Sequence, residues 1–397
     1  MPTQRAIIST PEPKDGAAKY AAELAAAVAQ SGIETILFCP RNFEFAAIAE
    51  AAGARVEAAP KREVSFASLP RRIWRNLVFL VRSARAQYRL TAPGDIVHFQ
   101  NPLHFPLGFV YYLLAWAKGG RVVLTAHDPL PHRWRLTGAL AGFERAMLKL
   151  AYRCADGLVV HNEAGMRVLR EHFQVPKEKI RIIPHGPYQV ASRKIDYPDF
   201  QPLRLLCFGA IRENKGLHLV IEAYGQVKDS LPVPVTLTIR GELHTAAESE
   251  YWQQCRKAIE ANSEGIDVRL EFVPDAEVSE LIERHHAVIL PYTDFHSESG
   301  VAALAISHRR PLLATDAGGL GELLREFDCG IRIASPTVEG VAQAIRAAAH
   351  AGPEKLEAMG LHGEQGLRER RSWRSIGNRT AEFYRELTSK GNEAFLA

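Results

Sequence analysis

Two cationic side chains follow an apolar segment in the second half of the chain. In LLCFGAIRENKGLHLVIEAY, Gly209, Arg212 and Lys215 stand between a strand-like run and a helical pattern that continues through Leu219. Arginine offers planar bidentate donors and lysine a mobile point charge, so together they could bind a diphosphate and neutralise the charge on a leaving nucleoside diphosphate. An exposed loop with two ordinary cations would show the same pattern.

A second pattern that could bind an anion is SESGVAALAI, which follows the apolar run HAVILPY and the loop TDFH. Ser299, Gly300 and Val301 stand at the start of a predicted helix, where free N–H groups and the helix dipole favour negative charge. Ser299 would serve equally well as a simple N-cap. Further on, TDAGGLGE carries Glu322, which suits a ribose or sugar hydroxyl, although a helix-capping role is equally common.

The elements that must position these residues occur in two series of apolar runs that alternate with helical patterns. The first series is AIIS (6–9), TILFC (35–39), DIVHF (95–99), VVLTAH (122–127) and GLVVH (157–161). After a Pro-rich polar segment at 184–202, the second series is LRLLCFGA (203–210), VTLTIRG (235–241), VRLEFV (268–273), HAVILPY (286–292) and RPLLATDAGG (310–319). This rhythm predicts two α/β domains with parallel sheets, whose ligands collect at the carboxyl ends of the strands.

Composition sets the class of protein. The 397 residues exceed one ordinary hydrophobic core, and 47% hydrophobic with 24% charged residues is typical of a folded globular chain. The five scattered cysteines and an N-terminus without signal-peptide character lead us to expect a cytoplasmic protein. Residues 1–190 hold 25 Lys/Arg against 15 Asp/Glu, or +10, and residues 191–397 hold 24 against 30, or −6. The basic half suits an anionic surface or substrate.

The segment 68–90 concentrates part of that positive charge. At 100° per residue its arginines fall within an arc of about 80°, opposite an apolar side that includes Leu77, Leu80 and Tyr88. The arginines are Arg71, Arg75, Arg82, Arg85 and Arg89. Such a helix could lie at anionic lipid or face a phosphorylated acceptor, or it could pack on the core with a solvated basic face. The 13 apolar residues at 105–117 are too few to cross a bilayer, which takes about 20, and predict a buried helix.

In this order and spacing, the motifs resemble those of the retaining family 4 (group 1) glycosyltransferases of the GT-B fold. FGAIRENKG resembles their donor-phosphate loop, IIPHGPY (182–188) their interdomain segment and ATDAGGLGE their late glycine-rich turn. PKDGAA, with Gly16, resembles the glycine loop that faces the acceptor and donor phosphates, and TAHD, with His127, the loop beside the transferred sugar. The resemblance implies two Rossmann-like, doubly wound parallel-sheet domains that face a central cleft. The acceptor-side domain would be 1–186 with the helix 372–397, and the donor domain 187–371.

The chain departs from the family pattern at the paired glutamates near the donor, whose positions hold His296 and Leu304. Ala210 takes the commonest arginine position, with Arg212 as the apparent substitute. The base and sugar of the donor, the acceptor and the oligomeric state therefore stay open. An inactive glycan- or nucleotide-binding protein, or another GT-B enzyme such as a sugar-nucleotide epimerase or phosphorylase, stays an alternative.

By resemblance we expect a metal-independent retaining hexosyltransferase that uses UDP- or GDP-sugar, has no cofactor and binds no nucleic acid. Its acceptor would be lipid-linked or a polysaccharide repeat, with peripheral attachment to the inner membrane face through Arg71, Arg75 and Arg82. His127, Arg212 and Lys215 would act in catalysis, with His127 donating a hydrogen bond to the donor sugar. The other expected donor-binding residues are Gly16, Gly209, His296, Glu298, Ser299, Gly300, Val301 and Glu322.

Overall fold

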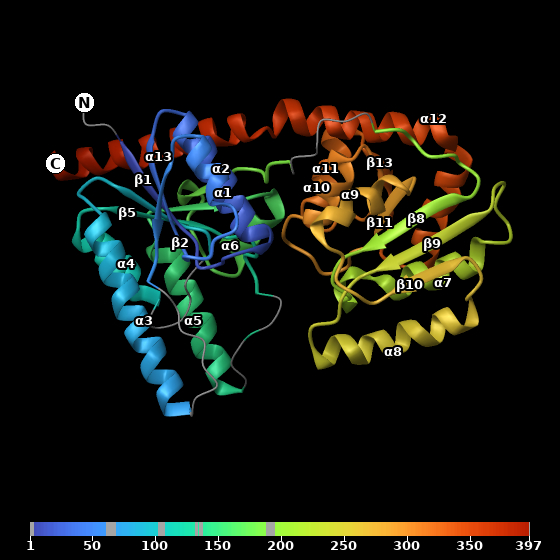
Figure 1. Cartoon of the computed structure of the whole chain (residues 1–397), viewed down its shortest axis with the longest axis horizontal. Coiled ribbons are helices and arrows are strands. Elements are labelled where there is room, and N and C mark those ends of the chain that lie inside the picture. Colours follow the sequence, from blue (N-terminus) through green and yellow to red (C-terminus); the bar gives the residue numbers. More distant parts are fainter. Residues whose placement is uncertain are drawn as a thin grey trace. The chain divides into compact units, whose positions relative to one another are not determined.

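The computed structural model describes residues 4–60, 69–101, 108–131, 134, 138–187 and 195–396. The chain divides into two compact units. The first contains Met1–His185 and Trp373–Ala397, and the second contains Gly186–Ser372 (Figure 1).

The first unit is built on a parallel sheet that, in the described residues, has seven strands in the order β3-β2-β1-β4-β5-β6-β7. The strands are β1 (Arg5–Ser9), β2 (Glu34–Cys39), β3 (Arg55–Ala58), β4 (Ile96–Phe99), β5 (Arg121–Thr125), β6 (Gly157–Val160) and β7 (Ile180–Ile182). The helices are α1 (Asp15–Gln30), α2 (Ala46–Ala51), α3 (Leu69–Leu90), α4 (Phe109–Ala117), α5 (Ala139–Cys154), α6 (Glu163–Glu171) and α13 (Trp373–Leu396).

Helices cover both faces of this sheet. On β1, Ile8 belongs to a core that includes Tyr20 of α1 and Tyr384 of α13. Its neighbour Ile7 points to the opposite core, which includes Tyr112 of α4. Because successive strand residues face opposite sides, a sheet buried on both faces needs near-continuous apolar strands, as the sequence has in 6–9 and 35–39.

The second unit repeats the plan with six described parallel strands in the order β10-β9-β8-β11-β12-β13. The strands are β8 (Leu203–Phe208), β9 (Val235–Arg240), β10 (Ile266–Arg269), β11 (Ala287–Leu290), β12 (Leu312–Ala314) and β13 (Gly330–Arg332). The helices are α7 (Leu217–Val227), α8 (Ala246–Ala261), α9 (Asp275–Glu283), α10 (Gly300–Ser307), α11 (Leu320–Phe327) and α12 (Val338–Arg370). Helix α12 bends at Gly352, whose φ of 77° is not helical and which precedes Pro353.

The predicted fold class, two α/β units with parallel sheets, is confirmed. One predicted strand is misplaced, because 268–273 was expected to be extended whereas β10 ends at Arg269. Beyond that end, Leu270 and Phe272 are exposed. The buried helix expected at 105–117 is described as α4 from Phe109, with Tyr112 buried and Leu113 exposed.

The C-terminal helix α13 packs on α1 so closely that one position admits only glycine. A Cβ added at Gly377 would lie 2.3 Å from the carbonyl oxygen of Ala27. We therefore expect Gly377→Ala to force the two helices apart and to lower the free energy of unfolding by about 1 to 3 kcal/mol, as overpacking does.

Thermal and urea unfolding followed by circular dichroism would measure this effect. The matched control is Gly142→Ala in α5, where an added Cβ meets no atom within 4 Å. That change should leave stability equal or raise it slightly, since alanine is the better helix former. An equal response of the two variants would contradict the close packing of α13 on α1.

Candidate functional site

A small pocket lies at the carboxyl end of β8 in the second unit. The chain leaves β8, turns at Gly209 with φ 111°, forms a 3-10 turn at Glu213–Lys215 and enters α7 through Gly216 with φ 68°. Both glycines hold backbone conformations that side chains with a Cβ rarely adopt. The lining includes Gly209, Arg212, Lys215 and Tyr292.

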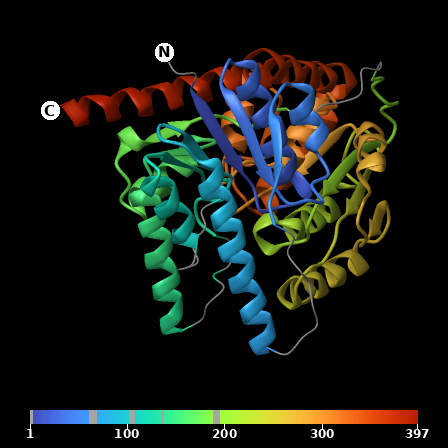
Figure 2. The ribbon, with the colours of Figure 1, turned by 60° about the vertical axis from the view of Figure 1, so that its left-hand side comes forward.

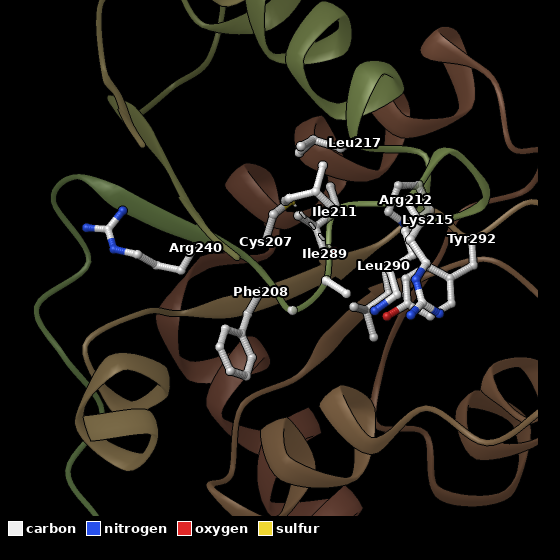
Figure 3. Close-up of a pocket in the computed structure, with 13 residues that line it drawn as sticks. Cys207, Phe208, Ile211, Arg212, Lys215, Leu217, Arg240, Ile289, Leu290 and Tyr292 are labelled. Carbon is white, nitrogen blue, oxygen red and sulfur yellow. Dashed lines mark hydrogen bonds between the residues drawn. The ribbon is translucent and has the colours of Figure 1, made fainter. Parts of the chain in front are cut away.

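This turn brings together residues of two motifs that the sequence suggested separately. A Cβ added at Gly209 would lie 3.3 Å from Lys215 Nζ and 3.3 Å from Val301 Cγ2. The lysine head group and the first turn of α10 therefore both border the bare backbone of Gly209. In Figure 3 the ends of Arg212, Lys215 and Tyr292 project to one side of the pocket, whereas Arg240 points the other way.

The two cations have different surroundings. Lys215 Nζ lies 5.5 Å from the centre of the Tyr292 ring. Arg212 Nε donates to Glu248 Oε1 at 3.2 Å, and the same glutamate completes a capping box with Thr245 at the start of α8. Burial alone would raise the pKa of Glu248, but bonds from the backbone N–H of His244 and Thr245 and the charge of Arg212 outweigh it and lower that pKa. A charged Glu248 thus orients Arg212 while leaving its other donors for a ligand.

Helix α10 presents its N-terminus beside this turn. Ser299 is its N-cap, and its Oγ accepts from the N–H of Ala302 at 3.2 Å. Tyr292 Oη lies 3.4 Å from the same Oγ, so the lining aromatic is linked to the cap. The N–H groups of Gly300 and Val301 belong to the first helical turn, where no intrahelical acceptor exists, and the dipole there favours an anion.

The other expected donor-binding residues of this unit lie outside the lining of the pocket. His296 Nε2 is 3.0 Å from Asp294 Oδ1, at the position where the family usually has a glutamate. Glu322 lies half-buried in the first turn of α11. Glu298 Oε1 lies 3.8 Å from Arg371 Nη1, and its carboxylate would be 2.4 Å from a Cβ added at Gly319. Glu298 thus packs against the glycine turn before α11.

In the first unit, His127 follows β5 at the carboxyl edge of the sheet. Its Nδ1 lies 2.9 Å from Nε2 of His161, which follows the neighbouring strand β6. Burial lowers the pKa of His127 well below its usual value, and the nearby histidines lower it further. Gly16 is exposed in the first turn of α1.

A larger cavity, of about 810 Å³, opens at the carboxyl ends of β1, β2 and β4. Its walls include the aromatic side chains of Phe38, Phe79, Phe99 and Tyr111, and its polar lining includes Arg41. A cavity with aromatic walls and few charges suits the faces of sugar rings or an apolar chain.

Helix α3 bears on the two alternatives that its sequence left open, an apolar side facing lipid or an apolar side packed on the core. Its arginines Arg71, Arg75 and Arg82 are exposed, as the pattern indicated. On the apolar side of the predicted pattern, Leu77 and Tyr88 are 39% and 36% exposed. With Trp74 at 66% and Val81 at 57%, they form an exposed apolar strip beside the arginines. The face that packs inward is narrower than the apolar side of the helical pattern, and it includes Ser83 and Gln87.

The described residues show neither a cluster of metal-ligating side chains nor a membrane-spanning helix. In the described ranges, no group of three or more His, Cys, Asp and Glu side chains is placed to hold a metal ion. Within those ranges there is also no helix with the length and apolar character needed to cross a membrane.

Comparison with known proteins identifies the family of this chain. The sequence model of Glycosyltransferase Family 4 matches residues 14–187, and that of Glycosyl transferases group 1 matches residues 202–350. The chain belongs to the group 1, family 4 glycosyltransferases. Its fold is GT-B. The structure of Anabaena HepE in complex with UDP and glucose aligns with a TM-score of 0.67 at 16% identity, covering 96% of this chain and 99% of that one.

Two curated relatives show how far the likeness extends. A glycogen synthase of Mycobacterium tuberculosis is 26% identical over 269 residues, 66% of this chain and 61% of that protein. A GDP-mannose:glycolipid 4-beta-D-mannosyltransferase of Xanthomonas campestris is 26% identical over 278 residues, 62% of this chain and 70% of that one. The match thus spans about three fifths of the length of the glycogen synthase.

Sequence reasoning missed several residues of this glycosyltransferase that the structure places beside the expected ones. Tyr292 ends the run HAVILPY and His161 ends GLVVH, so each follows an apolar strand just as His127 does. That position was the available signal for both. Glu248 gave no such signal, because its bond to Arg212 joins residues 36 apart in the chain.

The contacts of Glu298 generate a prediction about stability. Arg371 is 4% exposed and bonds Glu326 at 2.8 Å in addition to its contact with Glu298. Glu298→Gln should leave Arg371 with one carboxylate and lower the free energy of unfolding by about 1 to 3 kcal/mol, the cost of losing a buried charged partner. Nucleotide affinity should change less than twofold.

Urea unfolding and calorimetry with UDP and GDP would measure the two quantities. Glu339→Gln is the matched control, because Glu339 is 62% exposed and its pair with Arg346 should contribute less than about 1 kcal/mol. A Glu298→Gln variant with normal stability and weak nucleotide binding would support the donor-binding role expected for Glu298.

Proposed function

We propose that this glycosyltransferase moves a hexosyl unit, with retention of configuration, from UDP- or GDP-sugar to a lipid-linked or polysaccharide-repeat acceptor. The observation that carries the proposal is the convergence of Lys215 Nζ and Val301 on Gly209 at the end of β8. A lysine cation, a helix N-terminus and a bare glycine backbone are the parts of a phosphate site.

In the proposed reaction, Arg212 and Lys215 neutralise the charge that grows on the leaving diphosphate. The N-terminus of α10 adds a fixed dipole of the same sign. Such groups catalyse when they are held in place before the reaction, and the bond of Arg212 to Glu248 holds it so. The proposal includes no metal and no cofactor, because Arg212 and Lys215 can supply the positive charge that a divalent ion would otherwise bring to the leaving group.

The choice of donor draws on relatives. HepE has been solved with UDP and glucose, whereas the Xanthomonas enzyme is named for GDP-mannose. At this identity neither name decides the base, so both nucleotides belong in the first experiment. The cavity of the first unit, with its aromatic walls, supports an acceptor that carries sugar rings or an apolar chain.

The first experiment is calorimetric titration of UDP and GDP into wild type, Arg212→Ala and Lys215→Ala, followed by product analysis with UDP-glucose and GDP-mannose. A charged hydrogen bond is worth about 1.5 to 3 kcal/mol, so each variant should bind at least tenfold more weakly with a nearly unchanged melting temperature. Lys228→Ala is the control, since Lys228 lies outside the pocket lining and pairs with Glu264.

The outcomes separate the candidate functions. Unaltered affinity in both variants would remove Arg212 and Lys215 from the phosphate site. Tight nucleotide binding without transfer or hydrolysis of any nucleotide sugar would indicate a binding protein. Activity that vanishes in EDTA and returns with a divalent ion would contradict the metal-independent mechanism.

The surface of the first unit supports attachment to an anionic membrane, where a lipid-linked acceptor would be found. Helices α3 and α5 extend beyond the sheet on one side of this unit (Figures 1 and 2). Of the ten large hydrophobic side chains exposed in the described residues, eight lie on α3, α4 and α5. They are Trp74, Leu77, Val81, Tyr88, Leu113, Leu140, Phe143 and Leu150. On α3 they stand directly beside the arginines, as in a helix that lies at a lipid interface.

Liposome co-sedimentation tests this attachment. Each cation near an anionic surface contributes roughly 1 kcal/mol, so changing Arg71, Arg75 and Arg82 to Glu should abolish pelleting on anionic vesicles at low salt. Wild-type binding should weaken as salt rises, because screening shortens the Debye length to about 3 Å at 1 M. The control changes the exposed Arg167, Arg170 and Lys177 of the same unit to Glu and should pellet as wild type. Equal pelleting of the two triple variants would reject attachment through α3.

A further inference from the structure

A chain of hydrogen bonds runs along the carboxyl edge of the first unit's sheet, across three neighbouring strands. His127 follows β5, His161 follows β6 and Ile183 follows β7. His127 Nδ1 lies 2.9 Å from His161 Nε2, and His161 Nδ1 lies 2.9 Å from the carbonyl oxygen of Ile183. Parallel strands end side by side, so hydrogen bonds at this edge can link the residues that follow β5, β6 and β7.

The backbone carbonyl at the end of the row determines where the protons lie. A carbonyl oxygen only accepts, so His161 must carry its hydrogen on Nδ1. In its neutral form His161 has one N–H, which the carbonyl of Ile183 places on Nδ1, so Nε2 is then an acceptor. The partner nitrogen, Nδ1 of His127, must then be the donor, which leaves Nε2 of His127 as a lone pair.

That lone pair is buried, and among the described residues it has no hydrogen-bond partner. Burial lowers the pKa of His127, so the ring stays neutral and Nε2 gains no proton at neutral pH. The Tyr20 ring meets the His127 ring edge-on, with centroids 4.7 Å apart, and the His161 ring at 5.2 Å. Packing thus restrains the rings and keeps the two histidines in register.

We propose that His161 is a positioning residue that fixes His127 as a hydrogen-bond acceptor, and that the group His127 receives is a sugar hydroxyl. A phosphate or carbonyl oxygen has no hydrogen to donate to Nε2, whereas a hydroxyl has one. This inference rests on the proposed glycosyl transfer and reverses the expectation that His127 donates to the sugar. The hydroxyl belongs to the donor sugar or to the acceptor, and the chemistry is the same for both.

The first test reads the protonated nitrogen directly, without substrate. The sample is full-length protein labelled with ¹⁵N-histidine at pH 7.5. The NMR signals of the His127 ring are assigned as those that disappear in His127→Gln. They should show hydrogen on Nδ1 and a pyridine-type Nε2 without hydrogen. His161→Leu should abolish this preference, and His161→Gln should restore it, because an amide can donate to Ile183 and accept from His127. A wild-type His127 with hydrogen on Nε2, or on both nitrogens, overturns the inference.

His98→Leu is the matched control for a merely structural role. His98 is equally buried in the same region, and it bonds Tyr384 Oη at 2.6 Å and Thr125 Oγ1 at 2.7 Å. This variant should retain the Nδ1–H form of His127 even where its melting temperature falls. Loss of that form in His98→Leu as well as in His161→Leu would mean that general packing sets the proton position, and would reject a specific role for His161.

The second test identifies the hydroxyl by kinetics with UDP-glucose or GDP-mannose, whichever is turned over, and with deoxy analogues of that donor and of the acceptor. His161→Leu should lower kcat/KM at least tenfold, and His161→Gln should recover most of the loss. On the analogue that lacks the contacted hydroxyl, wild type and His161→Leu should be equal. A penalty that persists on every deoxy donor and acceptor overturns the hydroxyl assignment. If no nucleotide sugar is turned over, the proposed function fails while the NMR result still decides the role of His161.

Discussion

Burial of both faces of a parallel sheet is the constraint from which the rest of this structure follows. In the first unit, Ile7 and Ile8 of β1 enter opposite hydrophobic cores, and in the second unit Leu205 and Leu206 of β8 do the same. Polar chemistry is therefore excluded from the strands and collects where they end. Because all strands point the same way, residues from distant parts of the sequence meet at one edge, as Lys215 and Val301 do at Gly209.

The two units differ in the charge of the side chains at that edge. The second unit places cations at it, and the ion pair of Arg212 with the anchored Glu248 fixes the direction of one guanidinium before any ligand binds. The first unit holds imidazoles that are kept neutral, since burial lowers the pKa of both His98 and His127. Charged groups suit a diphosphate, and neutral groups suit sugar hydroxyls, which need directed hydrogen bonds without added charge.

Helix α3 has three faces, namely a basic face, an exposed apolar strip and a buried face. A pattern that divides a helix only into a polar and an apolar side does not describe it. Its inward face is narrow and carries polar Ser83 and Gln87, so part of its apolar surface faces outward. Exposed apolar strips of this kind mark interaction surfaces. A protein partner would account for Trp74 and Val81 alone, but the adjoining arginines and the +10 charge of residues 1–190 favour an anionic surface. Neither the apolar strip nor the positive charge contributes much alone, so the proposed membrane attachment would be reversible.

The limits of sequence reasoning follow from the same physics. Central strands such as β1 and β11 were predictable because burial on both faces requires continuous apolar runs. The half-exposed strands β3, β10 and β13 lack that requirement, and their sequences carry little signal. Within the candidate site, glycines and cations after strands could be found, because their types are unusual at those positions. The role proposed for His161 could not be predicted, because it depends on the carbonyl of Ile183, and every residue type has a carbonyl. The proton positions inferred for this histidine chain depend on the folded backbone, because folding brings the Ile183 carbonyl to His161.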